Sequence, residues 1–343
     1  MRKNVAAIFG LVLALWAPCR VAAADFPRFD GKVEADLMSG DFARLEALAD
    51  TYRAPQSVLD DNIRYIHYFY SDLSNIKHAE CACEGKSGLY TFDEKRDAIA
   101  KWQKALPESK TATIAMAALY EADAWVERSG GAASEVSDEQ WRLYFERLHA
   151  ASEIIAPLDA KFDPYIYELQ YGIAESHRGA RPELDAIYQQ EVRDFPNYID
   201  YYTTHARMLE PYWFGRPGEL AAYLKSLRGR PGGETGAMLT IYLAASAVWM
   251  SPDHRYVSDE TGLTYHDLLQ AYDAWNKPDA SNNYGQNLLM IYALTGGDRD
   301  EAAELAKKID GKWNRGVFRT KVDFDNAAAW ASAPWWMRFF QAG

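Results

Sequence analysis

The residues best suited to chemistry lie in one short polar segment of this 343-residue chain. Cys81 and Cys83 are separated by a single residue, and His78 lies three positions before the first of them. A disulfide across one intervening residue closes a small, strained ring, and strained disulfides are labile or redox-active. Two other outcomes stay open: thiols that are free or linked to a partner, and a soft metal ion held by His78, Cys81 and Cys83. No second ligand pair follows at a zinc-site spacing, so we predict no metal and no cofactor.

Other catalytic motifs are missing from the sequence. Residues 85–87 (GKS) match the end of a phosphate-binding loop, but Glu80 replaces its first glycine and no strand pattern precedes it. The sequence has no nucleophile elbow, no zinc-protease helix and no dinucleotide fingerprint, and its seven histidines are scattered. We therefore predict a protein that is not an enzyme. A glycan hydrolase or lyase that works with two carboxylates would leave no motif, so it remains the alternative.

Aromatic residues are abundant, with 11 Trp, 22 Tyr and 14 Phe. Most should fill the spaces between packed helices, although the same rings can stack on sugars. The chain ends in a densely aromatic segment that begins at Trp330. This segment either caps the last helices or docks on a partner or membrane interface. Its candidate docking residues are Trp335, Trp336, Phe339 and Phe340.

The N-terminus has the pattern of a secretion signal. Arg2 and Lys3 precede a short apolar run over residues 5–16, and Ala22–Ala24 offers a small-residue cleavage site. We expect residues 1–24 to be removed after Ala24, which places the protein in a bacterial periplasm or outside the cell. No later stretch has the ~18 apolar residues of a transmembrane helix.

The chain is acidic. It carries 37 basic and 49 acidic residues, a net charge of −12. Removal of the signal takes away Arg2, Lys3 and Arg20 and leaves 34 against 49, a net charge of −15. Such a surface argues against nucleic acid as a partner and favours either solubility alone or a protein or peptide that is basic.

Apolar periodicity predicts an all-α protein. In residues 287–309 an apolar helix runs into Gly296 and Gly297, and Asp298 then caps a second helix. Ser137 and Gln140 have the spacing of a capping box at the start of another helix. No alternating strand pattern is present. Besides a helix within 31–52 and this hairpin, the expected helices span 58–76, 93–106, 107–128, 137–155, 164–176, 182–194, 196–209, 217–227, 237–250 and 265–275.

Proline spacing suggests a repeat. Pro164 and Pro196 each open a helix and lie 32 residues apart, close to the period of about 34 in tetratricopeptide repeats. Gly172 and Tyr188 occupy offsets typical of the small and aromatic positions of that repeat. We therefore predict that residues 25–343 form one degenerate, tetratricopeptide-like array of antiparallel helical hairpins, an α-solenoid, with a candidate hinge near residues 228–236.

Several segments resemble an uncharacterised group of bacterial tetratricopeptide-like proteins. The resemblance covers most of the chain after the signal and implies stacked helical hairpins, without implying an activity or a site. The Cys81–Cys83 loop is not part of it. The matching segments are 37–42 (LMSGDF) with 45–48 (LEAL), Trp102 with 106–109 (LPES), 124–130 (AWVERSG), 137–143 (SDEQWRL) with 146–148 (ERL), 212–220 (YWFGRPGEL) and 293–299 (ALTGGDR).

Two functions follow as expectations. The first is an exported scaffold that binds a protein or peptide in the bacterial envelope, in assembly, secretion or neutralisation of a toxin. Helical repeats and the lack of catalytic motifs favour it. The second is an all-helical carbohydrate-active or sugar-binding protein, which export and the high aromatic content favour.

Overall fold

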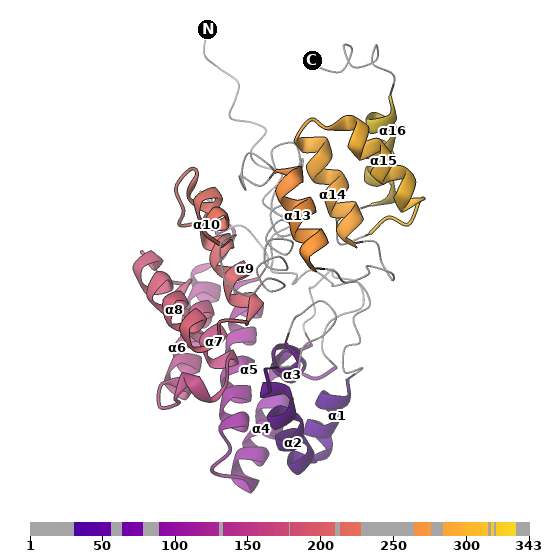
Figure 1. Cartoon of the computed structure of the whole chain (residues 1–343). Helices are drawn as coiled ribbons and strands as arrows, with labels where there is room; N and C mark the ends of the chain where they lie inside the picture. The colour runs from indigo at the N-terminus through magenta and orange to yellow at the C-terminus, as the bar shows by residue number, and fades with distance from the viewer. Residues whose placement is uncertain are drawn as a thin grey trace. The chain divides into compact units, whose positions relative to one another are not determined.

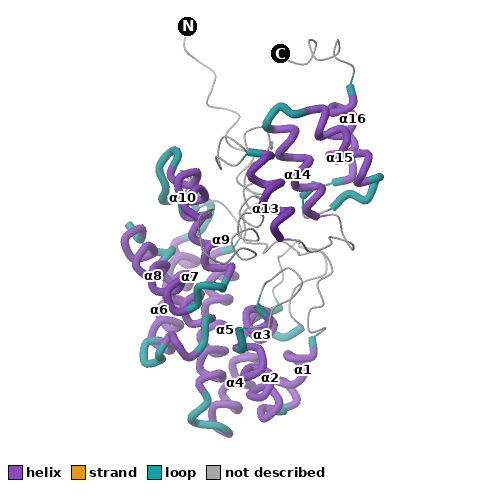
Figure 2. The backbone as a smooth tube through the Cα atoms, in the orientation of Figure 1, coloured by secondary structure: helices purple, strands orange, loops and turns teal. Residues whose placement is uncertain are grey.

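The computed structural model is all-α in the residues that it describes, and these contain no β-strand (Figures 1 and 2). The prediction of an all-helical protein is thereby confirmed. The chain divides into two compact units, Met1–Tyr198 and Ile199–Gly343. The predicted signal, hinge and helix over 237–250 lie outside the described residues. Those residues are 31–55, 64–77, 89–129, 133–177, 179–209, 213–227, 264–275, 284–314, 317–318 and 320–333.

Eight α-helices are described in the first unit, together with a short 3₁₀ turn, η2, at Ala160–Phe162. They are α1 (Lys32–Ser39), α2 (Phe42–Arg53), α3 (Tyr65–Ser74), α4 (Phe92–Ala105), α5 (Lys110–Arg128), α6 (Asp138–Ile155), α7 (Tyr165–Ala174) and α8 (Arg181–Asp194).

Side-chain caps fix where several of these helices begin. Ser137 accepts a hydrogen bond from the backbone N–H of Gln140, whose side chain accepts one from the backbone N–H of Ser137 at 3.0 Å. The predicted capping box of α6 is thus confirmed. Thr91 and Glu94 form the same box at α4, and Asp41 caps α2 by accepting from the N–H of Arg44. Each cap satisfies backbone donors that the helix itself leaves without a partner.

Helix α5 is the central element of the first unit and contacts α3, α4, α6 and α7 (Figure 1). Its sequence explains this position, because small residues occupy several of its faces. Ala112, Ala115 and Ala118 are fully buried, as are Ile114 and Leu119. Small side chains let neighbouring helices approach closely, so one helix can be covered on several sides.

Contacts between helices follow the order of the chain. Helix α1 contacts α3, α3 contacts α5, and α5 contacts α7. Each of α2, α4 and α6 contacts the odd-numbered helix that follows it, and α1 also contacts α4. Successive helices therefore build the first unit mainly through near neighbours in the sequence.

Six helices are described in the second unit. The tight hairpin predicted around Gly296 and Gly297 is present: Gly297 has φ 84°, and Asp298 accepts from the N–H of Glu301. The second helix of this hairpin was expected to bury one face formed by Ala302, Leu305, Ala306 and Ile309. Three of these are buried, and Ala306 is half-buried. The six helices are α9 (Ile199–Met208), α10 (Glu219–Leu227), α13 (Tyr265–Trp275), α14 (Tyr284–Thr295), α15 (Arg299–Ile309) and α16 (Lys321–Ser332).

Helices α13 and α14 meet at a glycine. A Cβ atom at Gly285 would lie 2.0 Å from Cε2 of Tyr272, far inside van der Waals contact. The ring of Tyr272 therefore occupies the space that any larger residue at position 285 would need.

The boundaries differ from the sequence prediction in three ways. The single helix expected within 31–52, with its entry at residues 39–41, is two helices: Asp41 does cap the start of α2, but a separate helix, α1, precedes it and is closed by Gly40 with φ 81°. Helix α16 was not predicted. Pro107 and Pro196 were expected to open helices, but each stands before the first helical turn. Helix α5 begins at Lys110 with Ser109 as its N-cap, and α9 begins at Ile199.

Candidate functional site

The site residues predicted from the sequence lie outside the described residues. His78, Cys81 and Cys83 fall in 78–88, and the docking candidates Trp335, Trp336, Phe339 and Phe340 fall in 334–343. Their redox, metal-binding and docking roles stay predictions. Among the described residues, no group of three or more His, Cys, Asp or Glu side chains is arranged to hold a metal ion.

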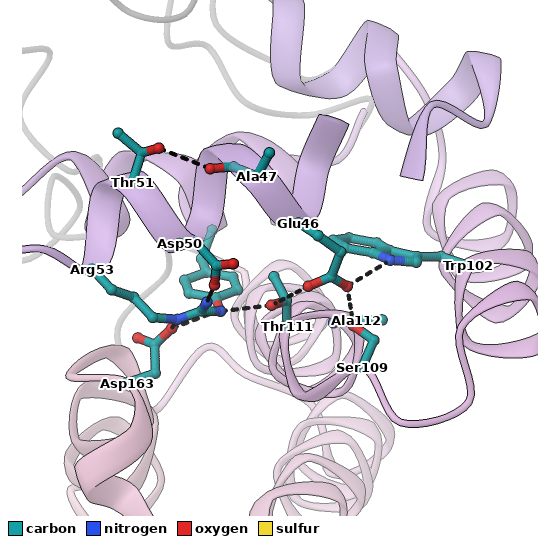
Figure 3. Close-up of polar contacts among 11 residues, drawn as sticks. Glu46, Ala47, Asp50, Thr51, Arg53, Trp102, Ser109, Thr111, Ala112 and Asp163 are labelled. Atoms are coloured by element: carbon teal, nitrogen blue, oxygen red, sulfur yellow. Dashed lines mark hydrogen bonds and ion pairs between the residues drawn. The ribbon is translucent and has the colours of Figure 1, made fainter. Parts of the chain in front are cut away.

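A carboxylate on α2 collects three side-chain donors (Figure 3). Glu46 accepts hydrogen bonds from the indole Nε1 of Trp102 at 3.0 Å and from the Thr111 hydroxyl at 2.9 Å, and it also accepts from the Ser109 hydroxyl. These donors come from α4, from the residue that caps α5, and from the first turn of α5. Glu46 thus ties α2 to both helices.

Arg53, two turns further along α2, forms the centre of a second set of contacts (Figure 3). Its guanidinium lies 2.7 Å from carboxylate oxygens of Asp163 and Asp50, and donates to the Thr111 hydroxyl at 2.6 Å. It also donates to the Tyr70 hydroxyl at 3.3 Å. Thr111 therefore links the Glu46 and Arg53 contacts into one network across α2, α3, α5 and the start of α7.

The charge of Asp163 is compensated inside this network. Its side chain is fully buried, yet it accepts hydrogen bonds from Arg53, from the Tyr70 hydroxyl at 2.8 Å and from the backbone N–H of Tyr165 at 2.9 Å. Burial works to lower the pKa of Arg53, but Tyr70 and Asp163 raise it by more. Since donors and acceptors satisfy one another, this network holds helices together and offers no free group for catalysis.

A second polar cluster joins α3, α7 and α8. The carboxylate of Glu168 lies 2.6 Å from Nδ1 of His67 and accepts a hydrogen bond from the Tyr198 hydroxyl. Glu191 is 1% exposed, and burial, followed by the charge of Glu168, raises its pKa to about 9. Glu191 is therefore a neutral carboxylic acid at pH 7. The cluster resembles an acid–base pair, but a side chain this deeply buried cannot reach a substrate.

An aromatic patch, which we define as Trp125, Arg128, Trp141, Tyr144 and Phe145, is carried by α5 and α6. The Trp141 and Phe145 rings are stacked with centroids 5.6 Å apart and an interplanar angle of 19°. Tyr144 is buried beneath them and meets both tryptophans edge to face. The guanidinium of Arg128 lies 5.8 Å and 5.3 Å from the ring centroids of Trp125 and Trp141. Phe145 is 48% exposed and Trp125 and Trp141 are half-buried, so the patch presents mainly the Phe145 ring to solvent.

Acidic side chains lie beside the aromatic patch. Arg142, one turn from Phe145, forms ion pairs of 2.7 Å with Glu139 and Glu146, and all three side chains are more than half exposed. Ion pairs this exposed contribute little to stability. Both carboxylates can therefore exchange Arg142 for a cation from another molecule at small cost.

A shallow acidic recess lies between α15 and α16. Tyr265 donates to Glu301 at 2.7 Å, and Lys307 pairs with Glu304 at 2.6 Å. Asp298 serves as the N-cap of α15, so part of this acidity stabilises the start of that helix. The recess is lined by Asp298, Asp300, Glu301, Ala303, Glu304, Lys307, Ala331, Ser332 and Ala333.

Comparisons with known proteins identify no family. No protein-family model matches the chain, and neither the curated proteins nor the solved structures include a match. The resemblance to the tetratricopeptide-like group therefore stays a prediction. Among the described residues, no helix is both long and apolar enough to cross a membrane.

Sequence reasoning missed every cluster that the structure brings together. Arg53 and Asp163 are 110 positions apart, and His67 and Glu168 are 101 apart. Charged residues at such separations carry no local pattern. One signal was available for the aromatic patch, because Trp141 and Phe145 are four residues apart and so share a face of a helix.

Proposed function

We propose that this protein is an exported helical-repeat scaffold that binds a protein or peptide with a basic segment in the bacterial envelope. The aromatic patch is the single observation that carries the proposal. Trp and Arg are enriched among the residues that dominate binding energy, and here Trp125, Arg128 and Trp141 pack against one another on two contacting helices. The stacked pair Trp141–Phe145 requires no reordering before a partner binds.

Charge specifies the chemistry of the partner. The chain has a net charge of −12, and Glu139 and Glu146 lie beside the patch. Both pair with the exposed Arg142, and Glu146 also lies 4.0 Å from Arg147. An arginine or lysine of the partner would pair with these carboxylates while its alkyl stem covers the Phe145 ring. Complementary charge of this kind mainly raises the rate and specificity of binding, and it weakens at high salt.

The helix contacts of the first unit support the scaffold part of the proposal. Contacts between successive odd-numbered helices, and between each even-numbered helix and the next odd one, are those expected of stacked helical hairpins. Such stacks present extended surfaces, which suits binding to another chain. The secretion-like N-terminus supports the envelope as the place of action.

Affinity capture with matched variants tests the proposal. The purified protein is incubated with native envelope extract at low and high salt, and bound proteins are identified by mass spectrometry. We expect one dominant basic partner that is lost at high salt and lost in Trp141→Ala. Val322→Ala is the control, because Val322 is an exposed apolar residue on α16, 64% exposed. Partner capture that Trp141→Ala leaves unchanged would refute the role of the aromatic patch.

Sugar binding is the second candidate, and the same patch favours it, since aromatic faces stack on sugar rings. A glycan array that includes peptidoglycan fragments distinguishes sugar binding from protein binding. Binding there that Trp141→Ala abolishes, together with failure to capture any protein, would establish the sugar-binding function instead.

A further inference from the structure

Glu191 occupies a core position of α8. Leu184, Tyr188 and Glu191 follow one another at i, i+4 and i+7, the spacing of a single helix face, and all three are buried. This face packs on α7. An apolar residue is expected at the third of these positions, and a carboxyl group takes its place.

The Glu191 carboxyl has no hydrogen-bond partner among the residues that the structure describes, for either of its oxygens. Two donors of this cluster are engaged by the other carboxylate: His67 and Tyr198 both bind Glu168. Arg64 donates to the backbone carbonyls of Ala54, at 3.3 Å, and Pro55. The Arg64 guanidinium also lies over the Tyr198 ring, 5.6 Å from its centroid. Glu168 is therefore supplied with donors, and Glu191 is not.

Two ionisable side chains of α7, the helix packed against α8, interact electrostatically with Glu191: Glu168 and Tyr167. The charge of Glu168 disfavours ionisation of Glu191. The Tyr167 hydroxyl donates at 2.6 Å to Asp194, the last residue of α8, and Lys161 lies 3.6 Å from the same carboxylate. Lys161 is 66% exposed and serves Asp194 at the helix end, so it does not compensate Glu191.

Loss of the Glu191 proton would leave a buried negative charge with no donor beside the carboxylate of Glu168. An isolated buried charge costs several kcal/mol, more than a single helix contact returns. Hydration of the new carboxylate relieves that cost, and hydration requires α8 to separate from α7. Helix α7 also contacts α3, α5 and α6, whereas the main helix contact of α8 is with α7, so α8 is the element that moves. The hydrogen bond from Tyr167 to Asp194 must break when it does.

We propose that α8 is a proton-controlled element of the first unit, docked on α7 while the Glu191 carboxyl carries its proton and released from α7 when that proton is lost. Release exposes the apolar face of α8, formed by Leu184 and Tyr188, together with the surface of α7 that it covers.

Hydrogen–deuterium exchange of the full-length protein tests this proposal. Amide protection in 181–194 is compared at about pH 6 and about pH 9 after correction for the intrinsic exchange rate. In the wild type we expect protection of α8 to fall about tenfold or more at the higher pH, while α5 keeps its protection. In Glu191→Gln, whose side chain cannot ionise, α8 should stay protected at both pH values. Glu183→Gln removes an exposed carboxylate of the same helix, which lies 3.1 Å from His177, and α8 should lose protection at about pH 9 in it as in the wild type.

Two results would overturn the proposal: equal α8 protection at both pH values in the wild type, or a loss of protection in Glu191→Gln as large as in the wild type. The wild-type comparison decides by itself if the glutamine variant does not fold. Glu191→Leu is a second variant with no titrating group, and the same retention of protection is expected of it.

Discussion

Arg53 and Asp163 form a buried ion pair, with Nε 2.7 Å from Oδ2, between residues 110 positions apart. The pair joins α2 to the start of α7, and side-chain exposure falls to 11% for Arg53 and 0% for Asp163. Few contacts described here span so much of the sequence. It is therefore the point at which the packing of the first unit is most easily tested.

Removal of the arginine should destabilise the first unit strongly. Arg53→Ala leaves the buried Asp163 carboxyl without its main partner, and because burial already raises its pKa, the group must take up a proton or remain an uncompensated charge. Breaking a buried ion pair in this way typically costs about 3–5 kcal/mol. Chemical denaturation followed by circular dichroism measures the change. Asp50→Asn is the matched control, because it removes another ion-pair partner of the same guanidinium. The Asp50 side chain is 75% exposed, so its loss should cost less than about 1 kcal/mol. Equal losses in the two variants would contradict the assigned role of Asp163.

Glu191 should make the protein less stable as pH rises. Its pKa is about 9 in the folded state, against an ordinary value of 4.5. Between pH 4.5 and pH 9 the folded state therefore keeps a proton on Glu191 that the unfolded state has lost. Stability from this group is fully present below about pH 4.5 and is lost as pH rises towards 9, with a limiting slope of about 1.4 kcal/mol per pH unit. Glu191→Leu should remove this slope. Denaturation at several pH values measures the difference between the two proteins, and parallel curves would disprove the assignment.

Gly285 should tolerate no side chain. In Gly285→Ala the new methyl group would overlap the Tyr272 ring, so either that ring must shift or α13 and α14 must move apart, at a cost of about 1–3 kcal/mol. The second substitution Tyr272→Leu should restore part of the loss by vacating that space. Thermal denaturation of the single and double variants measures this, and a fully stable Gly285→Ala would show that the two helices do not meet in this way.

The cap of α6 should contribute measurably to stability. Ser137→Ala removes the acceptor for the N–H of Gln140 and should cost about 1 kcal/mol, whereas Ser137→Asp keeps an acceptor and should cost little. Thermal melts of both variants test this. If alanine and aspartate behave alike, the capping box has no energetic role.

Local signals in the sequence were sufficient for most helices and insufficient for the clusters. The start of α6 at Ser137 and the Gly297–Asp298 turn rest on residues three or four positions apart, and both were predicted. Helix α1 was missed because Gly40 and Asp41 end one helix and begin the next within two residues. The partner of Arg53 depends on how α7 packs, which no short window contains. Glu191 was missed because a carboxylate on a helix is ordinarily read as solvent-exposed.

The central position of α5 has a consequence for synthesis on the ribosome. The chain emerges from its N-terminus, so α3 and α4 are complete before the helix on which both rest. At about 5–20 residues per second, the 19 residues of α5 take roughly 1–4 s to appear. During that interval the sides of α3 and α4 that pack on α5 have no cover, although α1 and α2 already contact these helices. A nascent chain that ends before Lys110 is therefore the form that we expect to bind a chaperone.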